Sequence, residues 1–287
     1  MGGLLVVLSM SIAFLALTNY TTRALVVLLV TIGCAAIGFV DDYMKLTRRR
    51  SLGLAGRWKL VLLALISAGV AFVADHQHFS RRVYIPIVDG SVPLSWFWFG
   101  LLFLIVAGAA NGANLTDGLD GLASGVGIIS VFTFTAMSVI AYIRSSPVPA
   151  ARSLTNLDLA ILGAALIGAM IGFLWYNAFP AEVFMGDTGS MAIGGALAGF
   201  AIMTKTEFLL LLIGGIFLIE ALSVILQVIS FKYFGRRLFL MTPIHHHFEM
   251  KAWSETKIMV RFWILCGILC AVAFVLYYRY YFRFFRG

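Results

Sequence analysis

An acidic residue stands at the start of an apolar segment in the stretch 183–195, VFMGDTGSMAIGG. Asp187 lies between Gly186 and the pair Thr188-Gly189, in a chain in which only 12% of the residues are charged. Glycines let a ligand approach the backbone closely, and a helix start offers free N–H groups to an anion. A carboxylate beside such an anion site suits a bridging divalent metal. From this stretch alone, a helix capped by Asp187 or Thr188 is an equally good explanation.

Two adjacent acids, Asp41 and Asp42, follow the apolar run that ends in GFV. Lys45 comes four residues after Asp41, so on a continuing helix the two side chains point the same way. Paired carboxylates where a membrane helix meets water can bind a cation or position a nucleophile. An ordinary solvated helix end is the alternative, and taken alone this motif favours it slightly.

The segment 111–123, NGANLTDGLDGLA, carries a polar residue at every third position, namely Asn111, Asn114, Asp117 and Asp120. Helical spacing predicts that these side chains lie near one face, and Gly118 and Gly121 would permit close approach of a ligand. A turn rich in Asn, Asp and Gly is the alternative.

Three successive histidines, His245, His246 and His247, occupy the segment 241–249, MTPIHHHFE. Zinc ligands are usually spaced by a helical turn or a CxxC-like step, and no cysteine is near, so a zinc site is not expected. Histidines near phosphate can donate hydrogen bonds and carry partial positive charge near neutral pH. We favour that role over a plain polar loop.

The elements that must position these residues are apolar helices. The chain has 287 residues, 61% of them hydrophobic, and a mean hydropathy of +0.98, which is typical of a polytopic membrane protein. The net charge is +8, and the Lys and Arg residues lie in short loops between apolar runs. This pattern is typical of membrane anchoring and argues against a nucleic-acid partner. The cysteines, Cys34, Cys266 and Cys270, fall inside apolar runs and are expected to be core residues.

Apolar runs of nearly membrane-spanning length number about nine. They lie near 4–18, 24–40, 60–74, 96–110, 121–143, 158–175, 189–203, 208–231 and 259–279. We therefore predict an all-α polytopic membrane protein forming one domain over residues 1–287, with a short structural hairpin at 84–94. Glu220 and Gln227, seven residues apart in one span, are interpreted as a buried pair that packs helices, outside the site.

If the spans alternate, the candidate residues fall in or beside one set of loops, at 41–59, 111–120, 176–188 and 232–258. Twelve of the 21 Lys and Arg lie near this set, with dense clusters that include Arg49 and Arg50. The positive-inside rule then favours the cytoplasm for this set, and the sequence predicts a polar site at the cytoplasmic face. Secondary transporters place coupling acids near the midplane instead, which makes a transporter a remote alternative.

Together the motifs DDYMK, NGANLTDGLDG, NAFPAEVFMGDTGS and PIHHHFE, in this order, resemble the prokaryotic phospho-N-acetylmuramoyl-pentapeptide-transferase family, over nearly the whole chain. The resemblance implies a magnesium-dependent polyprenyl-phosphate phosphosugar transferase of the glycosyltransferase-4-like type. Such an enzyme moves phospho-MurNAc-pentapeptide from UDP-MurNAc-pentapeptide to undecaprenyl phosphate, giving lipid I and UMP in peptidoglycan biosynthesis. The histidine motif points away from the related GlcNAc-1-phosphate transferases, which remain the alternative.

Residue roles follow from the resemblance and from charge. A lipid phosphate is largely dianionic at neutral pH, so cations should supply most of the stabilisation when it meets a pyrophosphate. Asp187 is expected to hold Mg²⁺, with Asp41 and Asp42 at the lipid phosphate, one of them as proton acceptor or nucleophile. The phosphates are expected to be held by Lys45, His245, His246 and His247. The nucleotide and sugar side is expected to comprise Asn114, Asp117, Asp120 and Asn177, with Phe184 stacking on uracil.

The resemblance also implies ten helices and a multi-pass location in the bacterial inner membrane, with the active site facing the cytoplasm. Membrane lipids are expected partners, and a homodimer stays open. The family has a further N-terminal helix and a Lys/Gly-Thr-Pro-Thr segment ending in Met-Gly-Gly, the residues at which this sequence begins. We therefore expect the first family helix and a basic residue to be missing, and the polypeptide as written to be less active than a longer form.

Overall fold

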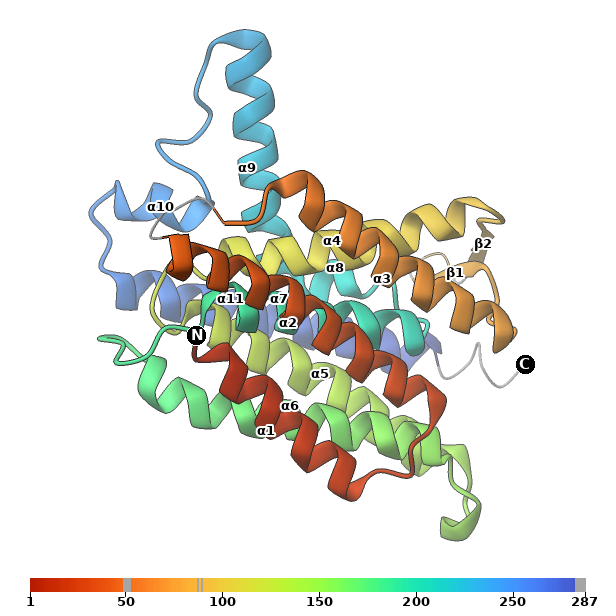
Figure 1. Cartoon of the computed structure of the whole chain (residues 1–287). Coiled ribbons are helices and arrows are strands. Elements are labelled where there is room, and N and C mark those ends of the chain that lie inside the picture. The colour runs from red at the N-terminus through yellow and green to blue at the C-terminus, as the bar shows by residue number, and fades with distance from the viewer. Residues whose placement is uncertain (49–52, 87, 89, 282–287) are drawn as a thin grey trace.

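The structure, a computed structural model, describes residues 1–48, 53–86, 88 and 90–281, and is mainly helical (Figure 1). The longer helices are Gly3–Leu17 (α1), Thr22–Arg48 (α2), Gly56–His76 (α3), Phe97–Thr116 (α4), Leu122–Ser145 (α5), Leu154–Asn177 (α6), Gly186–Met203 (α7), Gly215–Phe234 (α9) and Glu255–Leu276 (α11). Shorter elements are Leu210–Ile213 (α8), Ile244–Glu249 (α10), Pro149–Ala151 (η1), the π-helical Tyr277–Tyr281 (η2) and the strands Arg82–Ile85 (β1) and Gly90–Pro93 (β2).

Within the described residues, seven helices are long and apolar enough to cross a membrane: α2, α3, α4, α5, α6, α9 and α11 with its extension to Tyr281. The predicted all-α polytopic membrane fold is therefore confirmed. The other two predicted spans correspond to α1 and α7, which are apolar helices of 15 and 18 residues. A fully apolar crossing needs about 20 residues, so both are short for that purpose.

The predicted span 208–231 is wrong as a single helix. The short helix α8 ends at Ile213, and α9 begins after a break at Gly214. Two adjacent glycines, Gly214 and Gly215, stand at the break, and glycine is among the poorest helix formers. Figure 1 shows α9 rising away from the other helices, and many of its apolar side chains are exposed.

Helix α7 lies at the centre of the bundle, where every residue from Thr188 to Met203 is buried. It packs mainly against α2 and α4. Small residues permit this approach, since a Cβ added at Gly195 would fall 2.8 Å from the sulfur of Cys34 in α2. Because α2 and α4 end where α7 begins, close packing of the three helices places Asp41, Asn114 and Asp187 at the same end of the bundle.

The predicted hairpin is confirmed by antiparallel pairing of β1 with β2, in which Val83 faces Val92. Asp89, within the predicted hairpin 84–94, lies outside the described residues, as do Arg49 and Arg50. Figure 1 shows the hairpin at the opposite end of the bundle from α10, which carries the histidines. The two sets of loops thus lie at opposite ends, as alternation of the spans requires.

The cysteines behave as the sequence predicts. Cys34, Cys266 and Cys270 are all buried and unbridged. The sulfur atoms of Cys266 and Cys270 lie 4.0 Å apart, one helical turn from each other in α11. Their burial between helices agrees with the predicted role as core residues.

Candidate active site

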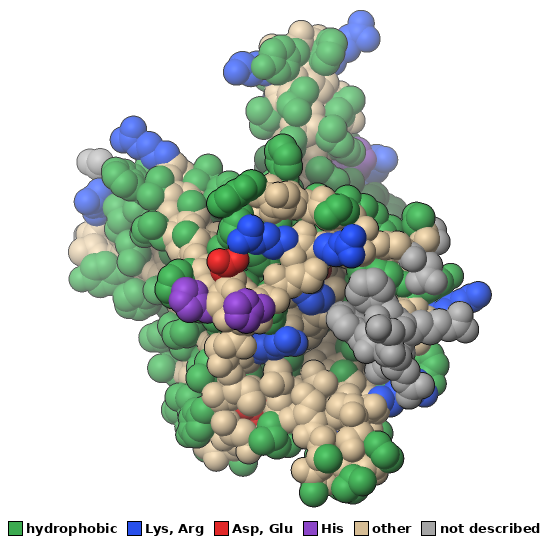
Figure 2. Space-filling model, turned by 90° about the vertical axis from the view of Figure 1, so that its right-hand side faces the viewer, with side chains coloured by type: hydrophobic (Ala, Val, Ile, Leu, Met, Phe, Trp, Pro, Cys, Tyr) green, Lys and Arg blue, Asp and Glu red, His purple; other side chains and the backbone are tan. Residues whose placement is uncertain are grey.

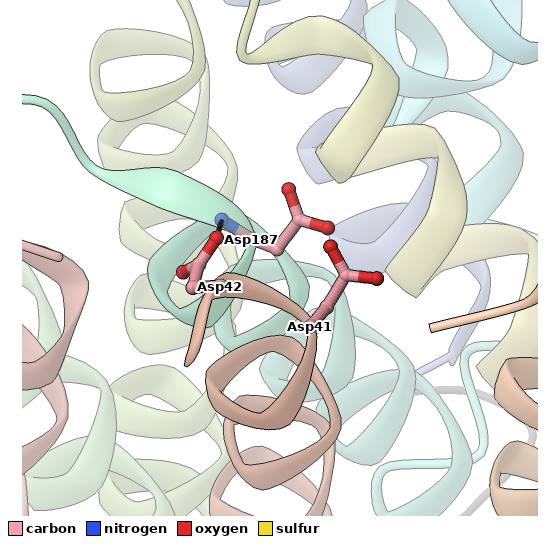
Figure 3. Close-up of side chains that lie close together, drawn as sticks. All are labelled: Asp41, Asp42 and Asp187. Atoms are coloured by element: carbon pink, nitrogen blue, oxygen red, sulfur yellow. Dashed lines mark hydrogen bonds between the residues drawn. The ribbon is translucent and has the colours of Figure 1, made fainter. Parts of the chain in front are cut away.

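Three carboxylates from two helices meet at this end of the bundle (Figure 3). Asp41 and Asp42 come from the last third of α2, and Asp187 comes from the first turn of α7. Each can offer one oxygen such that the three oxygens lie within 4.8 Å of one another. Asp41 and Asp42 are only 1% and 7% exposed. Buried carboxylates this close repel one another unless cations lie between them.

Two lysines supply those cations. The Nζ atom of Lys59 lies 3.0 Å from Asp41 Oδ1 and 2.9 Å from Asp187 Oδ2. Lys45 Nζ lies 2.6 Å from Asp41 Oδ2 and 3.2 Å from Asp187 Oδ2. The expectation that Asp41 and Lys45 share a helix face is therefore confirmed. Sequence reasoning missed Lys59 as a site residue and counted it only as a loop charge, although a lysine at the entry to an apolar helix was a signal.

Asp42 has a different task from its neighbour, because it caps α7 from another helix. Its Oδ1 accepts the backbone N–H of Asp187 at 3.1 Å, and its Oδ2 accepts the N–H and the hydroxyl of Thr188 at 3.0 and 2.7 Å. Gly186, at φ +76°, brings the chain so near that an added Cβ would fall 2.7 Å from Asp42 Oδ2. The cap that the sequence offered to Asp187 or Thr188 thus belongs to Asp42.

The carboxylate cluster fits a divalent metal. Mg²⁺ binds oxygen at about 2.0–2.1 Å in an octahedron, so ligands on opposite sides of the ion are about 4.1 Å apart. The separation of at most 4.8 Å needs only a small closure to reach that geometry. The Lys59 ammonium already bridges Asp41 and Asp187, which shows that a cation is held between these two oxygens.

The segment from Asn114 to Asp120 is not one helical face, because α4 ends at Thr116 and Asp117 begins a turn. Asn114, on the helix, donates from Nδ2 to the hydroxyl of Ser190 at 3.2 Å. Asp120, in the turn, accepts the backbone N–H of Ala181 at 2.9 Å and so holds the loop after α6. The prediction of a single helical stripe was wrong, since the glycines at 118 and 121 break the helix.

Asp117 lies in the field of the carboxylate cluster. Burial raises the pKa of its carboxyl well above the usual range, and the charges of Asp187 and Asp42 raise it further. A hydrogen bond with the Gly186 backbone opposes this shift. The carboxylates of Asp187 and Asp42 thus act on Asp117 through their charge, and the same charge is a reason for the site to attract cations.

Asn177 shapes the loop that carries Phe184. Its Oδ1 accepts the hydroxyl of Ser124 at 2.8 Å, and its Nδ2 donates to the carbonyl of Val183 at 2.9 Å. Both ends of this buried amide are therefore engaged within the protein. Phe184, next along the loop, is 67% exposed and presents its ring to solvent.

The three histidines occupy different environments in α10. His245 is completely buried, and its Nδ1 lies 3.1 Å from Oε1 of Glu220 in α9. Its other ring nitrogen, Nε2, has no hydrogen-bond partner among the described residues and lies so close to Gly118 that a Cβ there would overlap it. His246 pairs with Glu249, and His247 accepts the backbone N–H of Leu240 at Nδ1. Both are partly exposed.

Glu220 and Gln227 do not bond each other. Gln227 accepts the backbone N–H groups of Leu238 and Phe239 and donates to the carbonyl of Phe239, and so holds the chain that leads to α10. Glu220 holds the same segment through the side chain of His245. The two residues are thus positioned on one helix as the sequence predicts, but both support the histidine segment. Glu220 does so through His245, which contacts the turn at Gly118.

Comparison with known proteins identifies relatives of this chain. Residues 24–205 match the model of glycosyl transferase family 4. A phospho-N-acetylmuramoyl-pentapeptide-transferase of Bacillus velezensis is 44% identical over 276 residues, covering 95% of this chain and 81% of the relative. The Rubrobacter xylanophilus protein of the same name is 44% identical over 286 residues, covering 97% of this chain and 82% of its own.

Proposed function

Because the chain belongs to glycosyl transferase family 4, we propose that it transfers phospho-MurNAc-pentapeptide from UDP-MurNAc-pentapeptide to undecaprenyl phosphate, forming lipid I and UMP for peptidoglycan. The observation that carries this proposal is the cluster of Asp41, Asp42 and Asp187 bridged by two lysines at the start of a buried helix. It offers what phosphoryl transfer between two anions needs, namely held cations beside carboxylates.

Asp187 and Asp41 are the ligands that we propose for Mg²⁺, because their oxygens already share one ammonium group. When bound, the ion would neutralise charge on the pyrophosphate of the donor. Lys45 is 36% exposed and can turn from the carboxylates to a phosphate. Lys59 is more enclosed, and its ammonium holds the place between Asp41 and Asp187 until an ion enters.

Asp41 is the better candidate for the proton acceptor at the lipid phosphate. Both oxygens of Asp42 accept hydrogen bonds from the start of α7, so neither oxygen is free to take a proton from a substrate. Asp41 accepts one backbone N–H, from Leu54, and its other contacts are ammonium groups of side chains that can move. In this proposal Asp42 positions Asp187, and Asp41 receives the proton at Oδ2, the oxygen that does not share the Lys59 ammonium with Asp187.

On the donor side, exposed Phe184 is free to stack on uracil. Asn177 and Asp120 act by holding the loop around it, since their polar atoms bind that loop. We assign Asn114, which bonds Ser190 of α7, and Asp117, which lies in the field of Asp187 and Asp42, to the sugar phosphate. His246 and His247, partly exposed, are candidates for phosphate contacts, and buried His245 supports the turn at Gly118.

The experiment is release of UMP by the purified full chain in detergent. We expect release from UDP-MurNAc-pentapeptide only when Mg²⁺ and undecaprenyl phosphate are both present. UDP-GlcNAc as the donor tests the related GlcNAc-1-phosphate transferase. Release with UDP-GlcNAc but not with the pentapeptide donor would contradict the proposal, as would release that does not need the lipid.

We propose further that the protein lies in the bacterial inner membrane with this site facing the cytoplasm. Single cysteines at Thr47, beside the site, and at Val88, in the hairpin, test this in a chain with Cys34, Cys266 and Cys270 replaced by alanine. A membrane-impermeant maleimide should label position 88 in intact spheroplasts and position 47 only after the membrane is opened. The opposite pattern would reverse the orientation.

A further inference from the structure

A polar cavity lies at the hairpin end of the bundle, opposite the end that carries the carboxylates. It has a volume of about 220 Å³. Its cations come from three elements: Arg23 at the start of α2, Arg82 in β1 and Lys205 just after α7. Figure 2 views this end and shows Lys and Arg side chains gathered over the middle of the face, beside two histidines. Arg23 and Asp41 are 18 residues apart on α2, so the two sites are about 27 Å apart.

Two of the three cations have no acidic partner among the described residues. Lys205 is paired with Glu207 at 2.8 Å and donates to the carbonyl of Ser80 at 2.9 Å. In the described part of the chain, neither Arg23 nor Arg82 makes an ion pair, and the guanidinium of Arg23 lies over the ring of Phe79 at 4.5 Å. The nearby acid Asp75 is taken by Arg81. Among the described residues, the positive charge of this cavity is therefore not balanced by acids.

The backbone that carries the two arginines is held in place by the fold. The chain before Arg23 is anchored because Asp158 of α6 accepts the backbone N–H groups of Asn19 and Thr21 at 2.9 Å. Arg82 stands at the paired end of the hairpin, opposite Pro93. Positions fixed in this way limit the loss of conformational freedom when a ligand binds.

Uncharged donors also line the cavity. The side chains of Gln77, Ser80 and Ser91 face it and make no hydrogen bond to the residues that the structure describes. Guanidinium groups match two phosphate oxygens at once, and hydroxyl or amide groups can satisfy the others. Cavities that enclose a whole drug-sized ligand usually measure about 300–1,000 Å³, so this one suits a single small group.

We propose that this cavity binds a phosphate group, with Arg23 and Arg82 as its main contacts. The group belongs either to the headgroup of an anionic lipid or to free inorganic phosphate, since both present the same oxygens. Exposed Trp96 and Phe97 follow the hairpin at this end, where aromatic residues commonly mark the level of lipid headgroups. This site is independent of the transfer reaction proposed above, which lies at the other end of α2.

The test compares the purified full chain with the double variant Arg23→Gln plus Arg82→Gln. One arm measures phosphatidylglycerol retained from mixed phosphatidylglycerol and phosphatidylcholine nanodiscs by native mass spectrometry. The other arm measures the unfolding temperature in inorganic phosphate against chloride at equal ionic strength. Loss of two phosphate contacts should weaken binding about tenfold or more. An effect in the lipid arm alone identifies a headgroup, and one in the phosphate arm alone identifies the free anion.

The matched control is Arg152→Gln, at the same end but outside the cavity, where the guanidinium bonds the carbonyl of Ser146. It should behave as the unchanged protein in both arms. If the double variant does not fold, Arg82→Gln alone serves, because Arg82 is exposed and has no internal partner among the described residues. Equal retention and equal phosphate response in the unchanged and variant proteins, or no binding by either, would overturn the proposal. Release of UMP should be unaffected throughout.

Discussion

Asp42 and Thr188 are joined by two hydrogen bonds, in which the backbone N–H and the hydroxyl of Thr188 both donate to Asp42 Oδ2, at 3.0 and 2.7 Å. This contact links the end of α2 to the start of α7 and therefore sets the distance between Asp41 and Asp187. A helix cap stabilises a protein by about 0.5–2 kcal/mol. Because hydrogen bonds to a carboxylate are short and directional, this cap also fixes how α2 and α7 meet.

The first prediction concerns this cap. Thr188→Val removes the hydroxyl bond and leaves the backbone bonds, and we expect a loss of about 1 kcal/mol in the free energy of unfolding, with turnover reduced modestly. Asp42→Ala removes all three bonds and should cost more in both unfolding temperature and turnover. If Asp42→Ala lowered turnover without lowering the unfolding temperature, Asp42 would act on substrate and not as a cap.

The second prediction concerns charge at Asp187. Asp187→Asn keeps the size and one ligand oxygen but removes the negative charge that should hold Mg²⁺. Turnover should fall by about a hundredfold or more, as for other principal electrostatic groups, and excess Mg²⁺ should restore part of it. Uridine nucleotide binding, measured by calorimetry, should change little. Near-normal turnover at low Mg²⁺ would show that Asp187 is not a metal ligand.

Lys59 gives the third prediction, because its ammonium occupies the position between Asp41 and Asp187 that a metal would take. Lys59→Met should lower the Mg²⁺ concentration needed for half-maximal rate severalfold, since the competing cation is gone. Maximal turnover should fall at the same time. Arg57→Gln, in the same turn of α3 but exposed, is the control. An unchanged Mg²⁺ dependence in Lys59→Met would place the metal elsewhere.

The fourth prediction tests the contact between the turn after α4 and α10. Gly118→Ala would push a methyl group against Nε2 of buried His245, so the turn or the histidine must move. We expect a higher KM for the nucleotide donor with a smaller change in kcat. Gly108→Ala, on α4 where an added Cβ meets nothing within 4 Å, should leave KM unchanged. Equal KM values for the two variants would show that this contact does not shape the donor site.

The sequence alone determined the membrane character and most of the helices. The length and hydropathy of an apolar segment are local properties, so they predict a membrane-spanning helix without knowledge of the fold. It also marked Asp41, Asp42 and Asp187 as chemically unusual, since acids are costly beside a bilayer. Local pattern failed where glycine decided the structure. The break at Gly214 divided one predicted span, and the turn after Thr116 ended a predicted helical face.

Only the tertiary structure decided which residues share the site. Close packing of α2 and α4 on α7 brings together acids separated by more than a hundred residues, and no local spacing encodes that approach. Packing of α3 against α4 and α2 adds Lys59, and the contact of α2 with α7 gives Asp42 the N–H groups that it binds. The tertiary structure also divides three adjacent histidines into one buried residue and two partly exposed ones, because burial depends on what each side of a helix meets.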